Sequence, residues 1–114
     1  MNPVDLYTDL QKKTQHLDYS VKQLRENARK YAQAEKEYRI ILRKECLKLR
    51  DEGFPVGVIE KVCYGIESVA NARFKRDVAE EVLNANKEAI NVIKLQLRLI
   101  DNQIQREWND GNKT

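Results

Sequence analysis

Hydrophobic residues recur in alternating steps of three and four along the last third of the chain, from Ser68 to Trp108. These steps define a heptad seam, the apolar edge by which one helix packs on another, and no proline or glycine interrupts them. The spacing predicts one long helix over residues 68–108, with Ser68 as its N-cap. Its seam positions are Val69, Ala72, Arg76, Ala79, Leu83, Asn86, Ile90, Ile93, Leu97, Ile100 and Ile104.

A second seam with the same steps predicts a long helix over residues 18–52. Its start has two interpretations. Asn2-Pro3 carries a capping residue followed by a residue suited to a first turn, so residues 1–17 are a helical extension that either continues into this helix or breaks near Asp18. Its seam positions are Leu17, Val21, Leu24, Ala28, Tyr31, Glu35, Tyr38, Leu42, Glu45 and Leu49.

Residues 53–67 form the predicted connector, because Gly53 favours a helix C-terminus and Pro55 cannot continue a helix. A short helix inside the connector is expected to end at Gly65 and to need tertiary packing, since nucleating so short a helix is unfavourable. Residues 109–114 are expected to form a loose tail. The residues expected to pack over the end of the long helices are Phe54, Ile59, Val62 and Tyr64.

The pattern therefore predicts an all-α protein: a single domain made of an antiparallel, coiled-coil-like helical hairpin with a short helix in its connector. If residues whose numbers add up to 121 face each other, Glu45 meets Arg76 and Glu35 meets Asn86. A slip by one heptad would place both glutamates against apolar residues. An unpaired buried charge is strongly destabilising, so we expect this register.

The helix over 68–108 also carries a second apolar stripe, interrupted by Gln96. A helix that is apolar on two sides needs more than one partner. The N-terminal segment is one candidate to cover the stripe, and a second copy of the chain is the simpler one, so a homo-oligomer is predicted, with a dimer favoured. The stripe consists of Val78, Val82, Ala85, Ala89, Val92 and Leu99.

Composition narrows the class of protein. Charged residues make up 34% of the 114, the net charge is +3, and both signs are interspersed, which favours a helical protein with a solvated charged surface. No window approaches the roughly 18 apolar residues that cross a bilayer. The first residues lack the basic and apolar regions of a signal peptide. A cytoplasmic protein without membrane contact is expected.

The search for catalytic chemistry finds no motif. His16 is the single histidine, and Cys46 and Cys63 are not spaced as metal ligands, so no metal site, cofactor or enzymatic activity is expected. The two cysteines are predicted to be small buried hydrophobes. A disulfide between the first helix and the connector is the alternative, which a reducing compartment disfavours.

A partner surface is predicted at the connector end, where apolar residues stand among basic ones. The expected activity is binding to another protein. The alternative is contact with nucleic acid in replication or recombination, because basic residues cluster near the connector, although nearby carboxylates cancel much of their field. The candidate contact residues are Arg43, Lys44, Phe54, Val56 and Lys61.

Five motifs along the chain resemble a group of short all-helical proteins encoded by phages and prophages of Gram-positive bacteria. They are Tyr31–Tyr38, Leu49–Val56, Ala72–Glu80, Ala89–Lys94 and Glu107–Trp108. The resemblance implies a small accessory protein of the infected cell that binds a host or phage protein, for example as a counter-defence factor. A structural component of the virion is a further possibility. The resemblance implies no catalytic residue.

Overall fold

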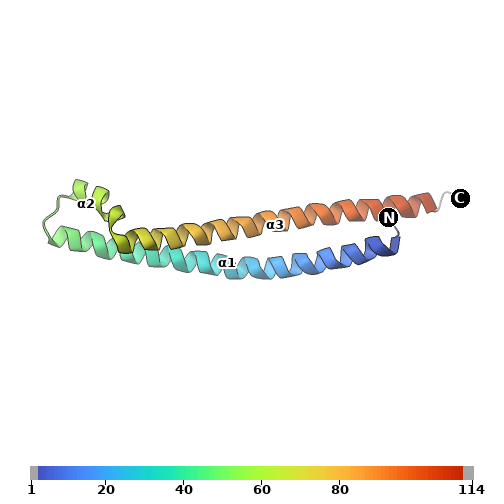
Figure 1. Ribbon diagram of the computed structural model, residues 1–114, viewed down its shortest axis with the longest axis horizontal. Helices are drawn as coiled ribbons and strands as arrows, with labels where there is room; N and C mark the ends of the chain where they lie inside the picture. Colours follow the sequence, from blue (N-terminus) through green and yellow to red (C-terminus); the bar gives the residue numbers. More distant parts are fainter. Residues whose placement is uncertain (1–2, 112–114) are drawn as a thin grey trace. The chain divides into compact units, whose positions relative to one another are not determined.

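The computed structural model describes residues 3–111, and within this range every regular element is helical (Figure 1). Helix α1 spans Pro3–Asp51 and α3 spans Glu67–Gly111. Between them lie α2 (Val56–Val62) and a single 3-10 turn, η1 (Cys63–Gly65). The fold is an all-α helical hairpin in which α1 packs against α3 across a short connector, as predicted.

Helix α1 has no break at Asp18, so the structure resolves the open question of its start in favour of Pro3. Its C-terminus is a Schellman motif: the Phe54 N–H donates to the Leu49 carbonyl and the Gly53 N–H to the Arg50 carbonyl. Gly53 adopts a φ of 91°, a conformation that a Cβ atom disfavours. The glycine therefore ends the helix where the sequence predicts.

The short helix α2 starts after Pro55, whose carbonyl accepts hydrogen bonds from the N–H groups of Val58 and Ile59. Ile59 is its buried residue, and Cys63 is buried in the following turn η1. The predicted packing of the connector is therefore only partly correct. Ile59 packs as expected, whereas three other residues predicted to cover the hairpin end remain substantially exposed: Phe54, Val62 and Tyr64.

Helix α3 begins at Glu67, one residue earlier than predicted, and continues to Gly111 instead of ending at Trp108. The described part of the expected loose tail, 109–111, is thus helical, and the rest lies outside the described residues. The predicted N-cap at Ser68 is wrong. Ser68 is the second residue of α3, and its hydroxyl donates a hydrogen bond to Glu45 Oε1 of α1 at 3.4 Å.

Internal contacts divide the chain into two compact units, each containing one part of α1 and one part of α3. The connector unit is residues 26–84 and also contains α2 and η1. Its core consists of two clusters that share the half-buried Leu42 and Ile66. One cluster is built on Tyr38, Val69 and Ala72, and the other on Leu49, Ile59 and Cys63.

The terminal unit comprises the described residues up to Arg25 and from Ala85 onward. Leu6 is almost completely buried there, so the first turns of α1 belong to a packed core. Ser20 is buried as well, and its carbonyl accepts a hydrogen bond from Asn86 Nδ2 at 3.1 Å. Within this unit the α3 seam is buried as predicted, with Ile90, Ile93 and Ile100 most enclosed.

The seam of α1 differs from the prediction at two positions. Val21 and Ala28 are exposed, and the residues one position earlier, Ser20 and Asn27, face inward instead. Apolarity alone favours Val21 over Ser20. The Asn86 side-chain amide donates to the Ser20 backbone carbonyl at 3.1 Å, so this hydrogen bond joins α1 to α3 at the buried Ser20.

The predicted register is also wrong. Arg76 approaches Glu35, with Nε 3.6 Å from Oε2, and not Glu45, which lies ten residues further along α1. The reason is the connector. Because Ile59 and Cys63 pack against Leu49, α2 and η1 cover the last turns of α1, and the first apolar contacts of α3 are made further back, by Val69 and Ala72 with Tyr38.

Candidate interaction surfaces

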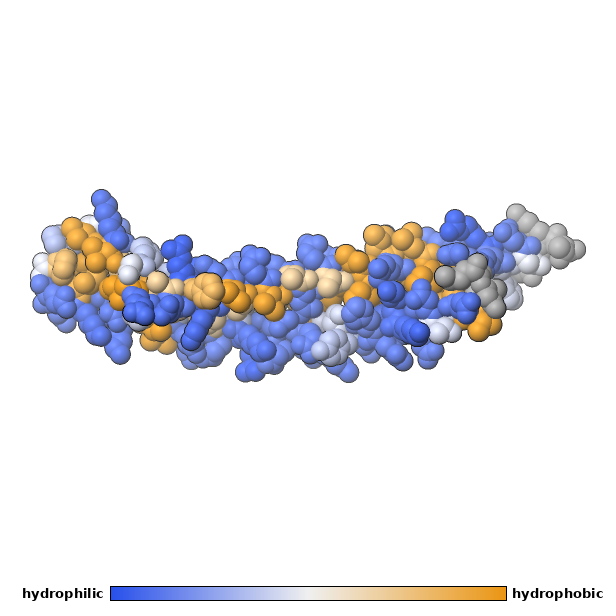
Figure 2. All heavy atoms as spheres, viewed as in Figure 1, coloured by the Kyte–Doolittle hydropathy of each residue, from blue (hydrophilic) through white to orange (hydrophobic). Residues whose placement is uncertain are grey.

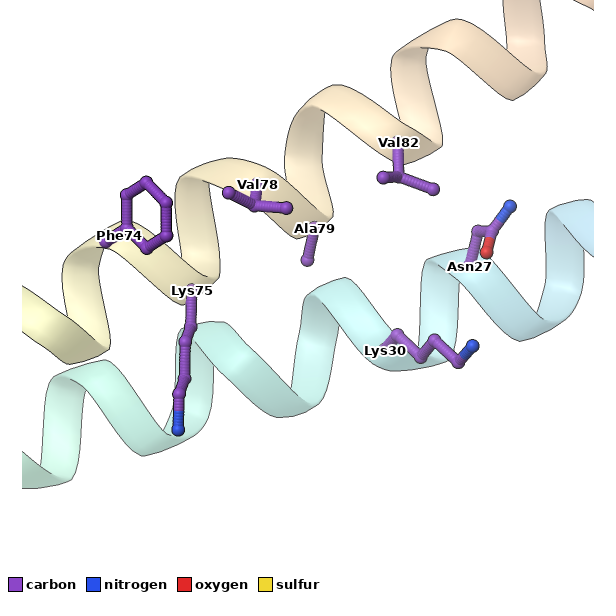
Figure 3. A pocket seen from close by; sticks show the side chains of 7 residues that line it. All are labelled: Asn27, Lys30, Phe74, Lys75, Val78, Ala79 and Val82. Atoms are coloured by element: carbon purple, nitrogen blue, oxygen red, sulfur yellow. The ribbon is translucent and has the colours of Figure 1, made fainter.

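Three apolar side chains form an exposed row along α3 in the connector unit: Phe74, Val78 and Val82. They are spaced four residues apart, so they lie on one face of the helix. Their exposed fractions are 69%, 45% and 48%. Figure 3 shows these three residues on α3, with Asn27 and Lys30 on the facing helix α1.

These residues, with Lys75 and Ala79, line a groove of about 330 Å³, named here the α3 groove. Its charged lining residues are both lysines, Lys30 and Lys75, and Lys75 extends from α3 toward α1 (Figure 3). Neither lysine forms a salt bridge with any residue of 3–111. The groove therefore offers an apolar floor beside two lysines that form no salt bridge within residues 3–111, although the charge of Lys30 also acts on the Glu26 carboxylate. That combination suits a helix with apolar residues on one face and carboxylates at its edge.

The α3 groove belongs to the second stripe predicted from the sequence. The members of that stripe in the terminal unit are exposed too, including Val92 and Leu99. The N-terminal segment packs in the same unit without covering them, so the alternative in which it shields the stripe is wrong. Figure 2 shows hydrophobic side chains at the surface of α3 among hydrophilic ones.

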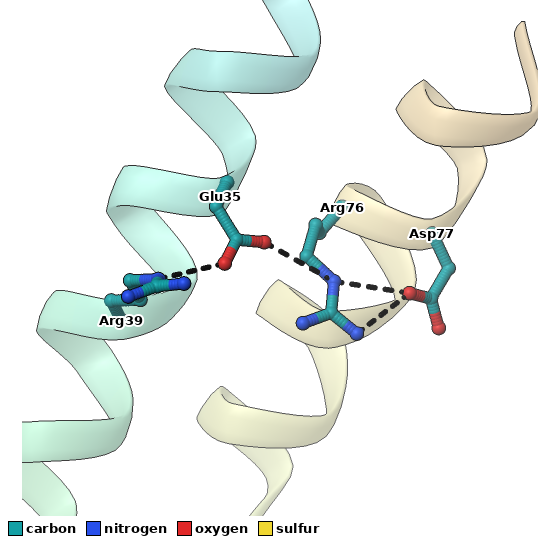
Figure 4. A network of polar contacts seen from close by, with 4 residues as sticks. All are labelled: Glu35, Arg39, Arg76 and Asp77. Carbon is teal, nitrogen blue, oxygen red and sulfur yellow. Dashed lines mark hydrogen bonds and ion pairs between the residues drawn. The ribbon is translucent and has the colours of Figure 1, made fainter. Parts of the chain in front are cut away.

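A polar network joins the two helices of the connector unit (Figure 4). Glu35 accepts a hydrogen bond from Arg39 Nε at 2.7 Å and lies 3.6 Å from Arg76 Nε. Arg76 in turn donates to Asp77 Oδ1 from Nη2 at 2.9 Å and from Nε at 3.1 Å. The hydrogen bond to Asp77 raises the pKa of Arg76, and the charges of Asp77 and Glu35 add to this. The network keeps a partly buried arginine charged and paired.

The other two predicted seam residues have partners different from those expected. Glu45 lies 3.5 Å from Lys48 Nζ and accepts the Ser68 hydroxyl, so its predicted pairing with Arg76 is absent. Asn86 donates to the Ser20 carbonyl in the terminal unit, and the predicted partner Glu35 belongs to the network of Arg76. Two of these hydrogen bonds, from Ser68 to Glu45 and from Asn86 to the Ser20 carbonyl, join α3 to α1, which is a structural role.

A basic hollow lies on the α1 face of the connector unit, and we name it the α1 hollow. It is lined by Arg39, Ile40, Arg43, Lys44 and Leu47. Ile40 and Leu47 are both exposed, and Arg39 is held by Glu35. Arg43 and Lys44 are exposed, and within residues 3–111 neither forms a salt bridge.

The five contact residues predicted from the sequence are all exposed. The α1 hollow brings Arg43 and Lys44 together, but Phe54, Val56 and Lys61 are not among its lining residues. These three lie in the connector. Near them, the Arg73 guanidinium stands 5.7 Å from the centroid of the Tyr64 ring.

Sequence reasoning missed several surface residues. Phe74 continues the second stripe four residues before Val78, a signal present in the sequence but not included in the predicted stripe. Ile40 and Leu47, seven residues apart, were hidden among basic residues. The terminal unit has a hollow of its own, whose lining residues include Tyr7 and Trp108, and Trp108 is largely exposed.

The residues described do not form a metal-binding cluster. His16 is exposed on α1. Among residues 3–111 no three His, Cys, Asp or Glu side chains gather as a metal site would require. None of the helices described is both long and apolar enough to cross a bilayer.

No known protein family, curated protein or solved structure matches this chain. Fold and surfaces thus define an all-α helical hairpin with exposed apolar and basic faces.

Proposed function

We propose that this protein is a non-enzymatic accessory protein that acts by binding other proteins. The observation that carries the proposal is the α3 groove. Its residues Phe74, Val78 and Val82 are exposed, whereas the seam of the same helix is buried against α1. Contiguous exposed apolar residues on a helix are typical of interaction sites. Isolated exposed valines are common on any surface, but a row at helical spacing is not.

The first occupant that we propose for the α3 groove is a second copy of the chain, giving a homodimer. The stripe has heptad spacing, and such a seam is complementary to another of the same kind. Two hairpins would then form a four-helix bundle in which their apolar stripes cover each other. Lys30 and Lys75 would lie at the edge of this interface. This arrangement removes from water the side chains that the isolated hairpin leaves exposed.

Solution mass tests this proposal. The wild-type chain is expected to be a dimer by light scattering. Val78→Glu combined with Val82→Glu should give a monomer, because both substitutions place charges in the dimer seam. Val56→Glu is the matched control, since Val56 is also an exposed valine but lies outside the α3 groove, and it should leave the dimer intact. A monomeric wild-type chain, or a double variant that remains dimeric, would refute the proposal.

For the heterologous partner, we retain the exposed connector residues Phe54, Val56 and Lys61 as one candidate surface and Arg43 with Lys44 as another. Two alanine variants separate them: one replaces the three connector residues, and the other replaces the two basic residues of α1. The variant that loses partner binding identifies the surface. Full binding by both variants would exclude these surfaces as the site.

A second candidate function rests on the α1 hollow. Arg43 and Lys44 are exposed cations without a salt-bridge partner in 3–111, and such groups can contact phosphates. If they bind nucleic acid, affinity for short DNA should fall steeply with salt, and Arg43→Ala with Lys44→Ala should weaken binding. The pair Lys12→Ala with Lys13→Ala is a control of equal charge change. Salt-independent or absent DNA binding would exclude this function.

The biological setting that we propose follows from the motif resemblance: a phage or prophage protein that acts in the host cytoplasm on a host or phage protein, for example in counter-defence. Its support is the ordered set of motifs from Tyr31 to Trp108. Copurification with virus particles would instead indicate a virion component.

A further inference from the structure

The only two cysteines of the chain lie in the same apolar cluster of the connector unit. Cys63, in η1, is buried with Leu49 and Ile59, and Cys46, in α1, packs against this cluster. The contact joins the end of α1 to the connector across seventeen positions of the chain. Both cysteines are free thiols.

The two thiols differ in exposure. Cys63 is 1% exposed, and its Sγ lies 3.7 Å from the Glu60 carbonyl, whereas Cys46 is partly open to solvent. Burial raises the pKa of Cys63, and the hydrogen bond and charge of the neighbouring Cys46 raise it further. Cys46 packs against the cluster that contains Cys63, so the two side chains lie in the same small apolar core. Cys46 is therefore the thiol that a small reagent reaches first, and Cys63 is the thiol next to it.

We propose that Cys46 and Cys63 form a reversible intramolecular disulfide in the folded protein, with a low-molecular-weight disulfide of the glutathione class as the oxidant. The inference stands apart from the proposed binding function, because it concerns the core of the connector unit. It also revises the expectation that both cysteines serve only as small buried hydrophobes.

The exchange has two steps. The Cys46 thiolate attacks one sulfur of the small disulfide, so a mixed disulfide forms, the small S–S bond breaks and one small thiol leaves. The Cys63 thiolate then attacks the Cys46 sulfur, forming the protein disulfide and releasing the second small thiol. The two protein thiols lose two electrons and two protons, and the small disulfide gains both. Excess small thiol reverses the sequence.

The disulfide would tie η1 to α1 and close a loop containing the Gly53 turn and α2. Closing a loop reduces the conformational entropy of the unfolded chain, so the oxidised protein should be more resistant to unfolding. In a reducing compartment the thiols stay free, and a rise in oxidised small thiols would lock the connector onto α1.

The test is an equilibrium in mixtures of reduced and oxidised glutathione, followed by intact mass after acid quenching. The expected product is a monomer that has lost two hydrogen atoms. Because the fold holds the thiols together, the ratio of oxidised to reduced protein should be at least about tenfold higher in buffer than in urea. Equal ratios in the two solvents would refute the proposal.

Single variants identify the roles of the two thiols. Cys63→Ser should stop at a mixed disulfide on Cys46, whereas Cys46→Ser should react much more slowly, since only the buried thiol remains. Circular dichroism verifies that each variant is folded. If a variant does not fold, the comparison of the wild-type protein in buffer and in urea still tests whether the folded state favours the disulfide. Glutathione adducts or intermolecular dimers as the main wild-type products would overturn the proposal.

Discussion

The Arg76 guanidinium lies over the aromatic ring of Tyr38, with its central carbon 4.5 Å from the ring centroid. Arg76 comes from α3 and Tyr38 from α1, so this cation–π contact joins the helices within the connector unit. Glu35, one turn before Tyr38, approaches the same guanidinium. The arginine thus has an aromatic face on one side and a carboxylate at its edge.

This contact predicts that Arg76→Ala lowers the free energy of unfolding by about 1–2 kcal/mol, measured by urea denaturation. Arg39→Ala is the matched control because Arg39 also pairs with Glu35, but its side chain is 76% exposed and the pair lies within one helix. Its loss should be below about 0.5 kcal/mol. Equal losses for the two variants would mean that the contact between helices contributes nothing.

The positive φ of Gly53 predicts the effect of alanine at that position. Gly53→Ala should destabilise the protein by about 1–2 kcal/mol, because a Cβ atom disfavours the left-handed conformation. Gly57→Ala should do the opposite and stabilise by about 0.5–1 kcal/mol, since Gly57 is helical and its Cβ would meet open space. Thermal melting of both variants measures the difference, and a stabilising Gly53→Ala would contradict the turn geometry.

Truncating Ile59 tests whether α2 is anchored to α1. Ile59→Ala should lower the free energy of unfolding by about 2–4 kcal/mol, because it leaves a cavity beside Leu49 and Cys63. Val58→Ala in the same helix removes a much more exposed side chain and should cost less than about 1 kcal/mol. Denaturant titration checks both, and similar losses would indicate that α2 does not pack as described.

The burial of Leu6 predicts that the start of α1 is an integral part of the terminal unit. Leu6→Ala should lower the free energy of unfolding by about 2–4 kcal/mol and speed amide hydrogen exchange in the first turns of α1. Val4→Ala changes an exposed residue two positions away and should leave exchange unchanged. Hydrogen-exchange mass spectrometry measures both, and fast exchange of this segment already in the wild type would contradict the prediction.

The sequence by itself determined the helical class and the helix-ending role of Gly53. Its heptad spacing also identified the buried edge of α3, where all eleven predicted seam positions are fully or partly buried. These features depend on local backbone preferences and on periodicity, which act within one helix whatever its partner is. Glu35, Glu45, Arg76 and Asn86 were likewise recognised as polar interruptions of a seam.

Only the tertiary structure decided how the seams meet. Two heptad seams can slide past each other while keeping their apolar faces together, so periodicity does not select a register. The register depends on the burial of Ile59 and Cys63 against the end of α1, which moves Arg76 to Glu35 instead of Glu45. In the terminal unit, the hydrogen bond from the Asn86 amide to the Ser20 carbonyl joins the two helices, and Ser20 is buried while Val21 is exposed. Both are contacts between distant parts of the chain, which local patterns do not specify.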